Sequence, residues 1–135
     1  MKETFTTSVP LSKVTVTDPF WGTYMELART RMIPYQWEAL NDRIPDAEPS
    51  HCIHNFRVAA GLEEGKFEGF VFQDSDLAKW LEGAAYSLVS HPDTELEATI
   101  DEVVKLIEKA QQPDGYLDTY YILNGLDKRW TNVRD

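Results

Sequence analysis

In the stretch Gln111-Gln112-Pro113-Asp114-Gly115-Tyr116-Leu117, an amphipathic helix ends in a sharp turn, and two tyrosines, Tyr120 and Tyr121, follow it. A second polar stretch, Phe72-Gln73-Asp74-Ser75-Asp76, opens the preceding helix. Two helices with a short connection run antiparallel, so the start of the first lies beside the end of the second. The sequence therefore predicts that carboxylates, amides and aromatic rings gather at one end of a helical hairpin.

The two helices of this hairpin are the clearest elements of the sequence. The first is expected to begin with Asp74 or Ser75 as its cap and to end at His91-Pro92. Its apolar stripe comprises Leu77, Trp80, Leu81, Ala84, Ala85 and Leu88. The second begins after Asp93-Thr94, and its expected buried face comprises Leu96, Ile100, Val103, Val104 and Ile107. Its acidic positions are expected to face solvent: Glu97, Asp101, Glu102 and Glu108.

The first half of the chain carries weaker signals. Residues 9–17 alternate Val14 and Val16 with polar residues, which predicts a short strand in an N-terminal β-arm over residues 1–17. Asp18 before Pro19 predicts the start of a helix. Pro34 is expected to interrupt it, and residues 35–40 are expected to continue as a kinked turn of helix. Ser50 is a candidate cap for a further short helix, and glycines at 61, 65 and 69 predict a loop.

Composition limits the partners of the chain. Its 135 residues are 42% apolar, enough for one packed domain, and carry a net charge of −10. No basic stripe is present, so we expect neither nucleic acid nor an anionic membrane as a partner. No stretch approaches the roughly 20 apolar residues that span a bilayer. The start of the chain lacks the pattern of a secretion signal and Cys52 is the single cysteine, which together predict a cytoplasmic protein.

Six residues are candidates for contact with a bound ligand at the predicted rim: Gln36, Asp74, Asp76, Asp114, Tyr116 and Tyr120. Structural roles compete with this hypothesis. Asp74 and Asp76 could cap a helix, and Asp114 could serve only the turn at Gly115. Tyr116 and Tyr120 could be core residues. The Gln36 amide, between Tyr35 and Trp37, could form hydrogen bonds with backbone groups that Pro34 leaves without a partner.

Cys52 lies between His51 and His54, a spacing that invites a metal site. Three possible metal ligands within four residues rarely bind one metal ion unless a fourth ligand comes from elsewhere in the chain. Packing and capping are therefore the favoured roles of these residues. We therefore expect no metal ligand and no catalytic residue among these 135 positions.

The ordered series of motifs resembles glycoside hydrolase family 127, the β-L-arabinofuranosidases, which are bacterial and fungal enzymes. The matching stretches include Ile33-Pro34-Tyr35-Gln36-Trp37, Asn55 to Gly61, Val71 to Asp76, Lys79 to Glu82 and Ala110 to Leu117. Val16 to Trp21 and Asn41-Asp42 also match. The resemblance implies an all-α fold in which helical hairpins form the first part of an (α/α)6 barrel, with the short β-arm in front. Residues 18–135 would then be an incomplete N-terminal part of that barrel.

The resemblance also implies a function and a cofactor. The family hydrolyses terminal β-L-arabinofuranosides of arabinose-containing oligosaccharides with retention of configuration. Its nucleophile is a cysteine thiolate bound to zinc together with other cysteines and a glutamate, and a second glutamate is the acid/base. These residues lie later in the barrel, so zinc is expected only in the full-length enzyme. This chain is expected to be an inactive fragment that associates with itself through uncovered helix faces.

Other classes of protein remain open. A non-catalytic carbohydrate-binding module would hold sugar with the same rim residues. A helical interaction module would use the apolar stripes of paired helices, although no repeat at a fixed period is present. A different (α/α)6 enzyme, such as an unsaturated glucuronyl hydrolase, would share the Asp114-Gly115-Tyr116 turn without the full series of motifs.

Overall fold

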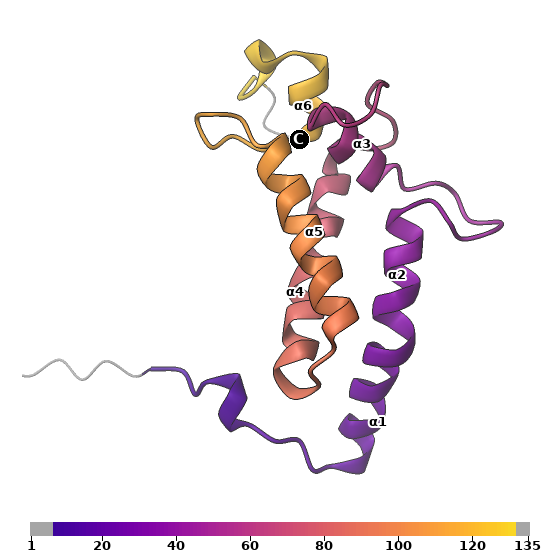
Figure 1. The fold of residues 1–135 in the computed structure, drawn as a ribbon, viewed down its shortest axis with the longest axis vertical. Helices are drawn as coiled ribbons and strands as arrows, with labels where there is room; N and C mark the ends of the chain where they lie inside the picture. The colour runs from indigo at the N-terminus through magenta and orange to yellow at the C-terminus, as the bar shows by residue number, and fades with distance from the viewer. Residues whose placement is uncertain (1–6, 132–135) are drawn as a thin grey trace, which may run out of the picture.

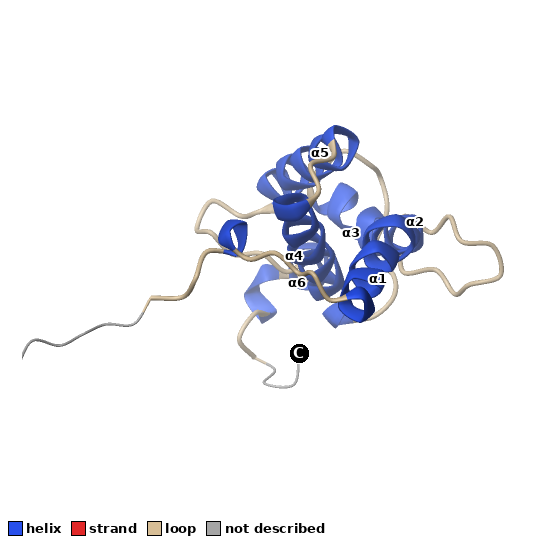
Figure 2. Ribbon diagram, turned by 90° about the horizontal axis from the view of Figure 1, so that it is seen from below, coloured by secondary structure: helices blue, strands red, loops and turns tan. Residues whose placement is uncertain are grey.

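The computed structural model describes residues 7–131, and this part of the chain is all-helical, as predicted (Figures 1 and 2). Its α-helices are α1 (Pro19–Leu27), α2 (Ile33–Leu40), α3 (Cys52–Ala59), α4 (Asp74–Ser90), α5 (Thr94–Ala110) and α6 (Thr119–Asn124). Short 3-10 helices cover Leu11–Lys13, Val71–Gln73 and Leu126–Lys128. None of the helices within residues 7–131 has the length and apolar character needed to cross a bilayer.

Helices α4 and α5 form the predicted antiparallel hairpin and lie side by side (Figure 1). Helix α4 ends at Ser90, immediately before His91-Pro92. Asp93 then caps α5, since its carboxylate accepts hydrogen bonds from the backbone N–H groups of Glu95 and Leu96, both at 3.1 Å. The bounds of the hairpin therefore agree with those predicted from Asp93 and from the spacing of the apolar residues.

Helix α4 is the centre of the core. It contacts α2, α3 and α5, and Leu77, Trp80 and Ala84 on its inner face are buried. The Trp80 ring stacks on Trp37 with centroids 4.8 Å apart, and its Nε1–H donates to the Ile33 carbonyl at 3.0 Å. Other buried apolar core residues are Ile33, Leu40, Cys52, Ile53, Phe56, Val103 and Ala110.

The chain stays helical past Pro34: the predicted continuation over residues 35–40 lies in α2, and the irregular turn comes before the proline. A π-helical turn, Ala28–Met32, joins α1 directly to α2. The Ile33 N–H donates to the carbonyl of Ala28, five residues earlier, and Pro34, which has no N–H, lies at the first turn of α2. The wider turn shifts the hydrogen-bond register just before the residue that cannot donate, so the chain stays helical.

The predicted β-arm is wrong over the described residues. Residues 7–17 contain no strand; Leu11–Lys13 is a 3-10 helix, and the chain then continues in an extended form. Val14 and Val16 remain 51% and 43% exposed. Alternation predicts an extended backbone, but a strand also needs a neighbouring strand to receive its hydrogen bonds. Residues 1–6 of the predicted arm lie outside the described part.

Two predicted caps are also wrong. So are two predicted core residues, Ala85 of α4 and Val104 of α5, because both side chains are exposed. Ser50 does not cap α3: its N–H donates to Asp42 at 2.6 Å, and His51 precedes the helix in a left-handed conformation. Asp74 is the first residue of α4, and no side chain caps that helix. Val104 is 51% exposed because it shares a stripe of α5 with acidic residues that face solvent.

Candidate functional site

The turn after α5 is held by its own backbone and by one carboxylate. Gly115 adopts φ 88°, a left-handed conformation, and its N–H donates to the Gln112 carbonyl at 2.8 Å. The Gln112 N–H donates back to the Tyr116 carbonyl at 2.9 Å. Asp114 accepts from the Tyr116 N–H at 3.1 Å. These bonds fix the direction in which the Asp114 and Tyr116 side chains leave the turn.

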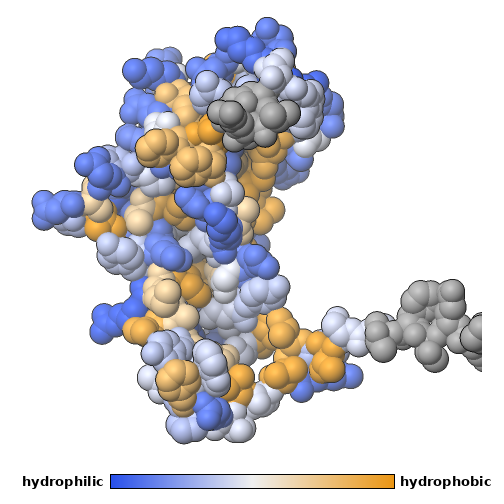
Figure 3. Space-filling model, turned by 180° about the vertical axis from the view of Figure 1, so that it is seen from behind, coloured by the Kyte–Doolittle hydropathy of each residue, from blue (hydrophilic) through white to orange (hydrophobic). Residues whose placement is uncertain are grey.

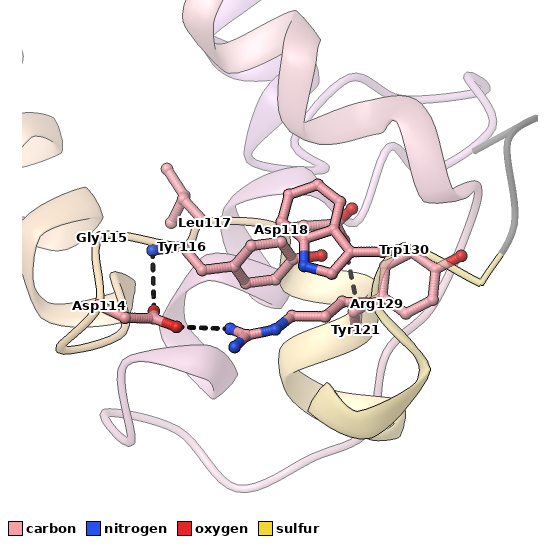
Figure 4. A pocket seen from close by; sticks show the side chains of 8 residues that line it. All are labelled: Asp114, Gly115, Tyr116, Leu117, Asp118, Tyr121, Arg129 and Trp130. Atoms are coloured by element: carbon pink, nitrogen blue, oxygen red, sulfur yellow. Dashed lines mark hydrogen bonds and ion pairs between the residues drawn. The ribbon is translucent and has the colours of Figure 1, made fainter.

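Arg129 contacts both of these side chains (Figure 4). Its Nη1 is 2.7 Å from Oδ2 of Asp114, and its guanidinium carbon is 5.1 Å from the centroid of the Tyr116 ring. Trp130 meets the same ring edge-to-face at a centroid distance of 5.4 Å. The Tyr116 N–H and the Arg129 guanidinium together lower the pKa of Asp114, so this carboxylate is ionised near neutral pH.

The start of α6 lies beside this turn. Asp118 caps α6 and accepts from the Tyr121 N–H at 3.2 Å. Thr119 is buried and donates both its N–H and its hydroxyl to the carboxylate of Asp74, at 2.6 and 2.7 Å. Burial raises the pKa of Asp74, and the bonds from Thr119 offset part of that effect. Asp74 therefore ties the start of α4 to the start of α6.

The turn after α5, the start of α6 and the segment with Arg129 line an open depression of about 650 Å³. Two carboxylates, one guanidinium and aromatic rings face it (Figure 4). Its lining residues are Asp114, Gly115, Tyr116, Leu117, Asp118, Tyr121, Arg129 and Trp130. Charged groups that bond hydroxyls, next to aromatic faces that cover C–H groups, are suited to a polyhydroxylated ligand.

Gln36 and Asp76 lie in a different depression, of about 620 Å³, beside Trp80 and Phe70. Gln36 is exposed and does not form the buried amide between aromatics that the sequence suggested. Asp76 forms an ion pair with Lys79 at 3.2 Å. Four of the six candidate residues are therefore divided between two surfaces, with Asp114 and Tyr116 on one and Gln36 and Asp76 on the other.

The remaining two candidates have packing contacts. Asp74 binds Thr119 as described, and Tyr120 packs edge-to-face against Phe67, with ring centroids 5.0 Å apart. Arg129 and Trp130 were missing from the candidate set. The sequence signal that could have indicated them is an arginine next to a tryptophan after a short helix, but nothing in the sequence relates that pair to Asp114.

Cys52 and its neighbouring histidines point to different partners. The Cys52 thiol is fully buried and donates to the Gln73 carbonyl at 3.3 Å, and burial raises its pKa to about 12. Nδ1 of His54 lies 2.9 Å from Glu63, and Nδ1 of His51 lies 3.7 Å from both Asp42 and Glu68. Within residues 7–131, no group of three or more histidine, cysteine or acidic side chains has the geometry to hold a metal ion.

Comparison with known proteins identifies similar chains. A non-reducing end β-L-arabinofuranosidase of Bifidobacterium longum subsp. longum is 48% identical over 120 residues, covering 80% of this chain and 18% of the relative. A crystal structure of a GH127 β-L-arabinofuranosidase from Geobacillus stearothermophilus T6 is 59% identical, with a TM-score of 0.88 over 91% of this chain and 19% of that one. A second solved GH127 β-arabinofuranosidase is 38% identical, with a TM-score of 0.72 over 85% of this chain and 17% of that one.

These matches have two consequences. The chain spans about a fifth of the length of its relatives, so its helices are part of a much larger unit in those proteins. The family model for the β-L-arabinofuranosidase GH127 catalytic domain covers residues 13–134, nearly the whole sequence. This chain therefore belongs to the GH127 β-L-arabinofuranosidase family.

Proposed function

We propose that this chain is the N-terminal portion of a retaining glycoside hydrolase that acts on terminal β-L-arabinofuranosides of arabinose-containing oligosaccharides. The observation that carries the proposal is the 59% identity and TM-score of 0.88 with the Geobacillus β-L-arabinofuranosidase over 91% of this chain. In that relative, the same local fold forms part of an enzyme named for this activity.

The depression beside Asp114 is the proposed sugar-facing surface. Asp114 and Arg129 can each bond hydroxyl groups, and the Tyr116 ring is held in place by its contacts with Arg129 and Trp130. Aromatic rings beside fixed polar groups orient small polar ligands in pockets. Gln36 and Asp76 would contact a more distant part of the substrate from their own depression, Asp74 would support the surface through Thr119, and Tyr120 would support it through its packing.

The chemical step requires residues outside this segment. A thiolate nucleophile needs a lowered pKa, whereas burial raises the pKa of Cys52 to about 12. The zinc expected in the family does not fit here, because the donors nearest Cys52 point to other partners. We therefore propose that the isolated chain is inactive and that the nucleophile, the acid/base and the zinc ligands belong to other parts of a full-length enzyme.

A chimera tests the proposal. Residues 13–134 would replace the matching segment of the Geobacillus relative, and hydrolysis of a terminal β-L-arabinofuranoside would be followed by NMR of the anomeric proton. The chimera is expected to release arabinose with retention, and the isolated chain is expected to release none. A folded chimera without activity, or turnover by the isolated chain, would overturn the proposal.

A second candidate function is carbohydrate binding without catalysis. Trp130 is 80% exposed next to Tyr116, an arrangement that leaves aromatic surface open to a ligand. Titration calorimetry of the isolated chain with an arabinose-containing oligosaccharide separates the two functions. Saturable binding that Trp130→Ala abolishes would favour the binding module, because a fragment of an enzyme pocket should bind only weakly.

Location and assembly are also proposals. We propose a bacterial, cytoplasmic protein, because the relatives with a stated source come from Bifidobacterium and Geobacillus and because Cys52 is buried without a disulfide partner. Self-association of the isolated chain is proposed from its exposed apolar side chains.

A further inference from the structure

The charges around the depression beside Asp114 do not cancel. Two carboxylates, those of Asp114 and Asp118, line it together with one guanidinium, that of Arg129 (Figure 4). No other basic side chain occurs among the described residues of its lining. Two negative charges against one positive charge leave one net negative charge, and a ligand in the depression meets this charge beside the rings of Tyr116 and Trp130.

The positive charge of Arg129 is already paired within the protein. Its Nη1 lies 2.7 Å from Oδ2 of Asp114, and its guanidinium carbon lies 5.1 Å from the centroid of the Tyr116 ring. An arginine that recognises a carboxylate on a ligand does so through its charge and its paired N–H donors together. In this depression the ion pair with Asp114 offsets that charge, so the remaining N–H groups of Arg129 suit a neutral hydroxyl better than a second carboxylate.

Asp118 has no cationic partner in the described part of the chain. Its carboxylate accepts the Tyr121 N–H at 3.2 Å, and no lysine or arginine within residues 7–131 forms an ion pair with it. Burial raises the pKa of Tyr116, the Asp118 carboxylate raises it further, and the Arg129 guanidinium opposes this with a smaller effect. The negative charge of Asp118 therefore outweighs the positive charge of Arg129 at the Tyr116 hydroxyl.

We infer that the depression selects neutral sugars over sugars that carry a carboxylate, such as uronic acids, and that Asp118 determines this specificity. A like charge without a counter-ion lowers the affinity for the wrong ligand and leaves the contacts with the right one unchanged. Neutral hydroxyl groups can still bond Asp114, Asp118 and Arg129, and C–H groups can still cover the Tyr116 ring. The inference rests on the proposed function, because it takes the ligand as a sugar; the discrimination by charge does not depend on the chemical step.

The test uses the chimera and two aryl β-L-arabinofuranosides of the same shape. One aglycone carries a neutral para-carboxamide and the other a para-carboxylate, and the measured quantity is the ratio of kcat/KM for the neutral substrate to that for the anionic substrate. Asp118→Asn is expected to lower this ratio about fivefold, an effect of the size expected for one charge close to the ligand at a protein surface. The amide oxygen of asparagine can accept the same Tyr121 N–H, so the cap of α6 is retained.

Two comparisons separate charge from structure. Asp101→Asn removes the same charge from the exposed face of α5 and is expected to leave the ratio unchanged. Raising the ionic strength from about 0.05 M to about 1 M is expected to lower the ratio of the parent chimera toward that of Asp118→Asn, because salt screens charges at a surface. A role of Asp118 in structure alone would not respond in this way. An unchanged ratio in Asp118→Asn, or an equal change in Asp101→Asn, would overturn the inference.

A folded chimera without activity on either substrate would sink the proposed function and leave the charge discrimination to a binding measurement. In that case the isolated chain is titrated with D-galactose and with D-galacturonate, two sugars that differ by the carboxylate, and NMR follows the indole N–H of Trp130. Galactose is expected to shift this signal with a dissociation constant about threefold lower than that of galacturonate, and Asp118→Asn is expected to remove the difference. Equal dissociation constants, or no shift with either sugar, would overturn the inference.

Discussion

Asp74 shows how one side chain sets the geometry of the candidate site. Its two carboxylate oxygens accept the N–H and the hydroxyl of Thr119, a residue 45 positions later. Burial raises the pKa of Asp74, so the ionised form is less favourable in the folded protein than in water. This tie holds the segment that carries Tyr116 and Asp118 against the start of α4.

Asp74→Asn is expected to preserve the tie without its charge, since the amide can accept the Thr119 N–H and donate to its hydroxyl. The pKa of Asp74 is higher in the folded protein than in the unfolded chain, where it is about 3.9. The contribution of Asp74 to the free energy of unfolding is therefore fully present below the unfolded pKa and is lost as the pH rises through the folded pKa. The variant should therefore gain free energy of unfolding relative to the parent between pH 4 and pH 7, as measured by urea unfolding.

The control for this titration is Asp101→Asn on the exposed face of α5. Its difference from the parent is expected to stay within about 0.5 kcal/mol at both pH values. A constant difference between parent and Asp74→Asn across the same range would contradict the assignment of a raised pKa to Asp74.

Asn55 ties α3 to the glycine-containing loop that follows it. The side chain is fully buried, donates to the Glu68 carbonyl at 2.8 Å and accepts from the Glu68 N–H at 3.0 Å. Asn55→Leu would leave both backbone groups unpaired, at about 1–3 kcal/mol each, so a loss of about 2–6 kcal/mol is expected in chemical denaturation. Asn124→Ala, which removes an exposed amide, is the control and should lower the free energy of unfolding by about 0.5 kcal/mol or less. Equal losses for the two variants would argue against a stabilising role for the hydrogen bonds between Asn55 and Glu68.

The long helical segment shows how an element accommodates a residue that disfavours it. Proline removes one donor from an α-helix and clashes with the carbonyl four residues earlier. Here the π-helical turn, Ala28–Met32, is separated from Pro34 only by Ile33, and the segment continues from α1 into α2 without a break. The carbonyl of Ile33, the first residue of α2, accepts the Trp80 side-chain N–H, which joins α2 to α4.

The cap of α5 gives a prediction for a single element. Asp93 accepts the N–H groups of both Glu95 and Leu96, and Asp93→Ala should lower the free energy of unfolding by about 1 kcal/mol, the usual value of such a cap. Asp101→Ala, in the middle of the same helix, is the control. Thermal unfolding followed by circular dichroism measures both, and a smaller loss for Asp93→Ala than for Asp101→Ala would refute the assignment of the cap.

For the molecule as a whole, large apolar side chains remain exposed at several places, among them Phe20, Trp21 and Tyr24 of α1. Figure 3 shows apolar side chains gathered at the lower end of the molecule. Phe70 and Phe72 stack on each other at 65% and 64% exposure, and Tyr86 on α4 is 55% exposed. Surface of this kind promotes weak association. The isolated chain is therefore expected to show a molar mass that rises with concentration in light scattering; a monodisperse monomer that melts cooperatively in calorimetry would contradict this.

The sequence determined the elements of this fold to the extent that they depend on local periodicity and capping. The apolar stripe of α4, the Asp93 cap, the Asp18 cap before Pro19 and the left-handed Gly115 are each fixed by interactions within a few residues. The ordered motifs also indicated the family, which the comparisons confirm. These features can be predicted from the sequence because aspartate at a helix start and glycine at a tight turn each favour one local backbone arrangement.

The site depended on contacts between distant segments, which no local pattern encodes. Only the tertiary structure separated Gln36 and Asp76 from Asp114 and Tyr116, and only it brought Arg129 onto that aspartate. The same limit explains the missing strand at Val14 and Val16, since pairing requires a neighbour that periodicity cannot supply. Spacing along the chain determined which residues share a helix face, whereas the packing of α3, α4 and α6 decided which side chains meet.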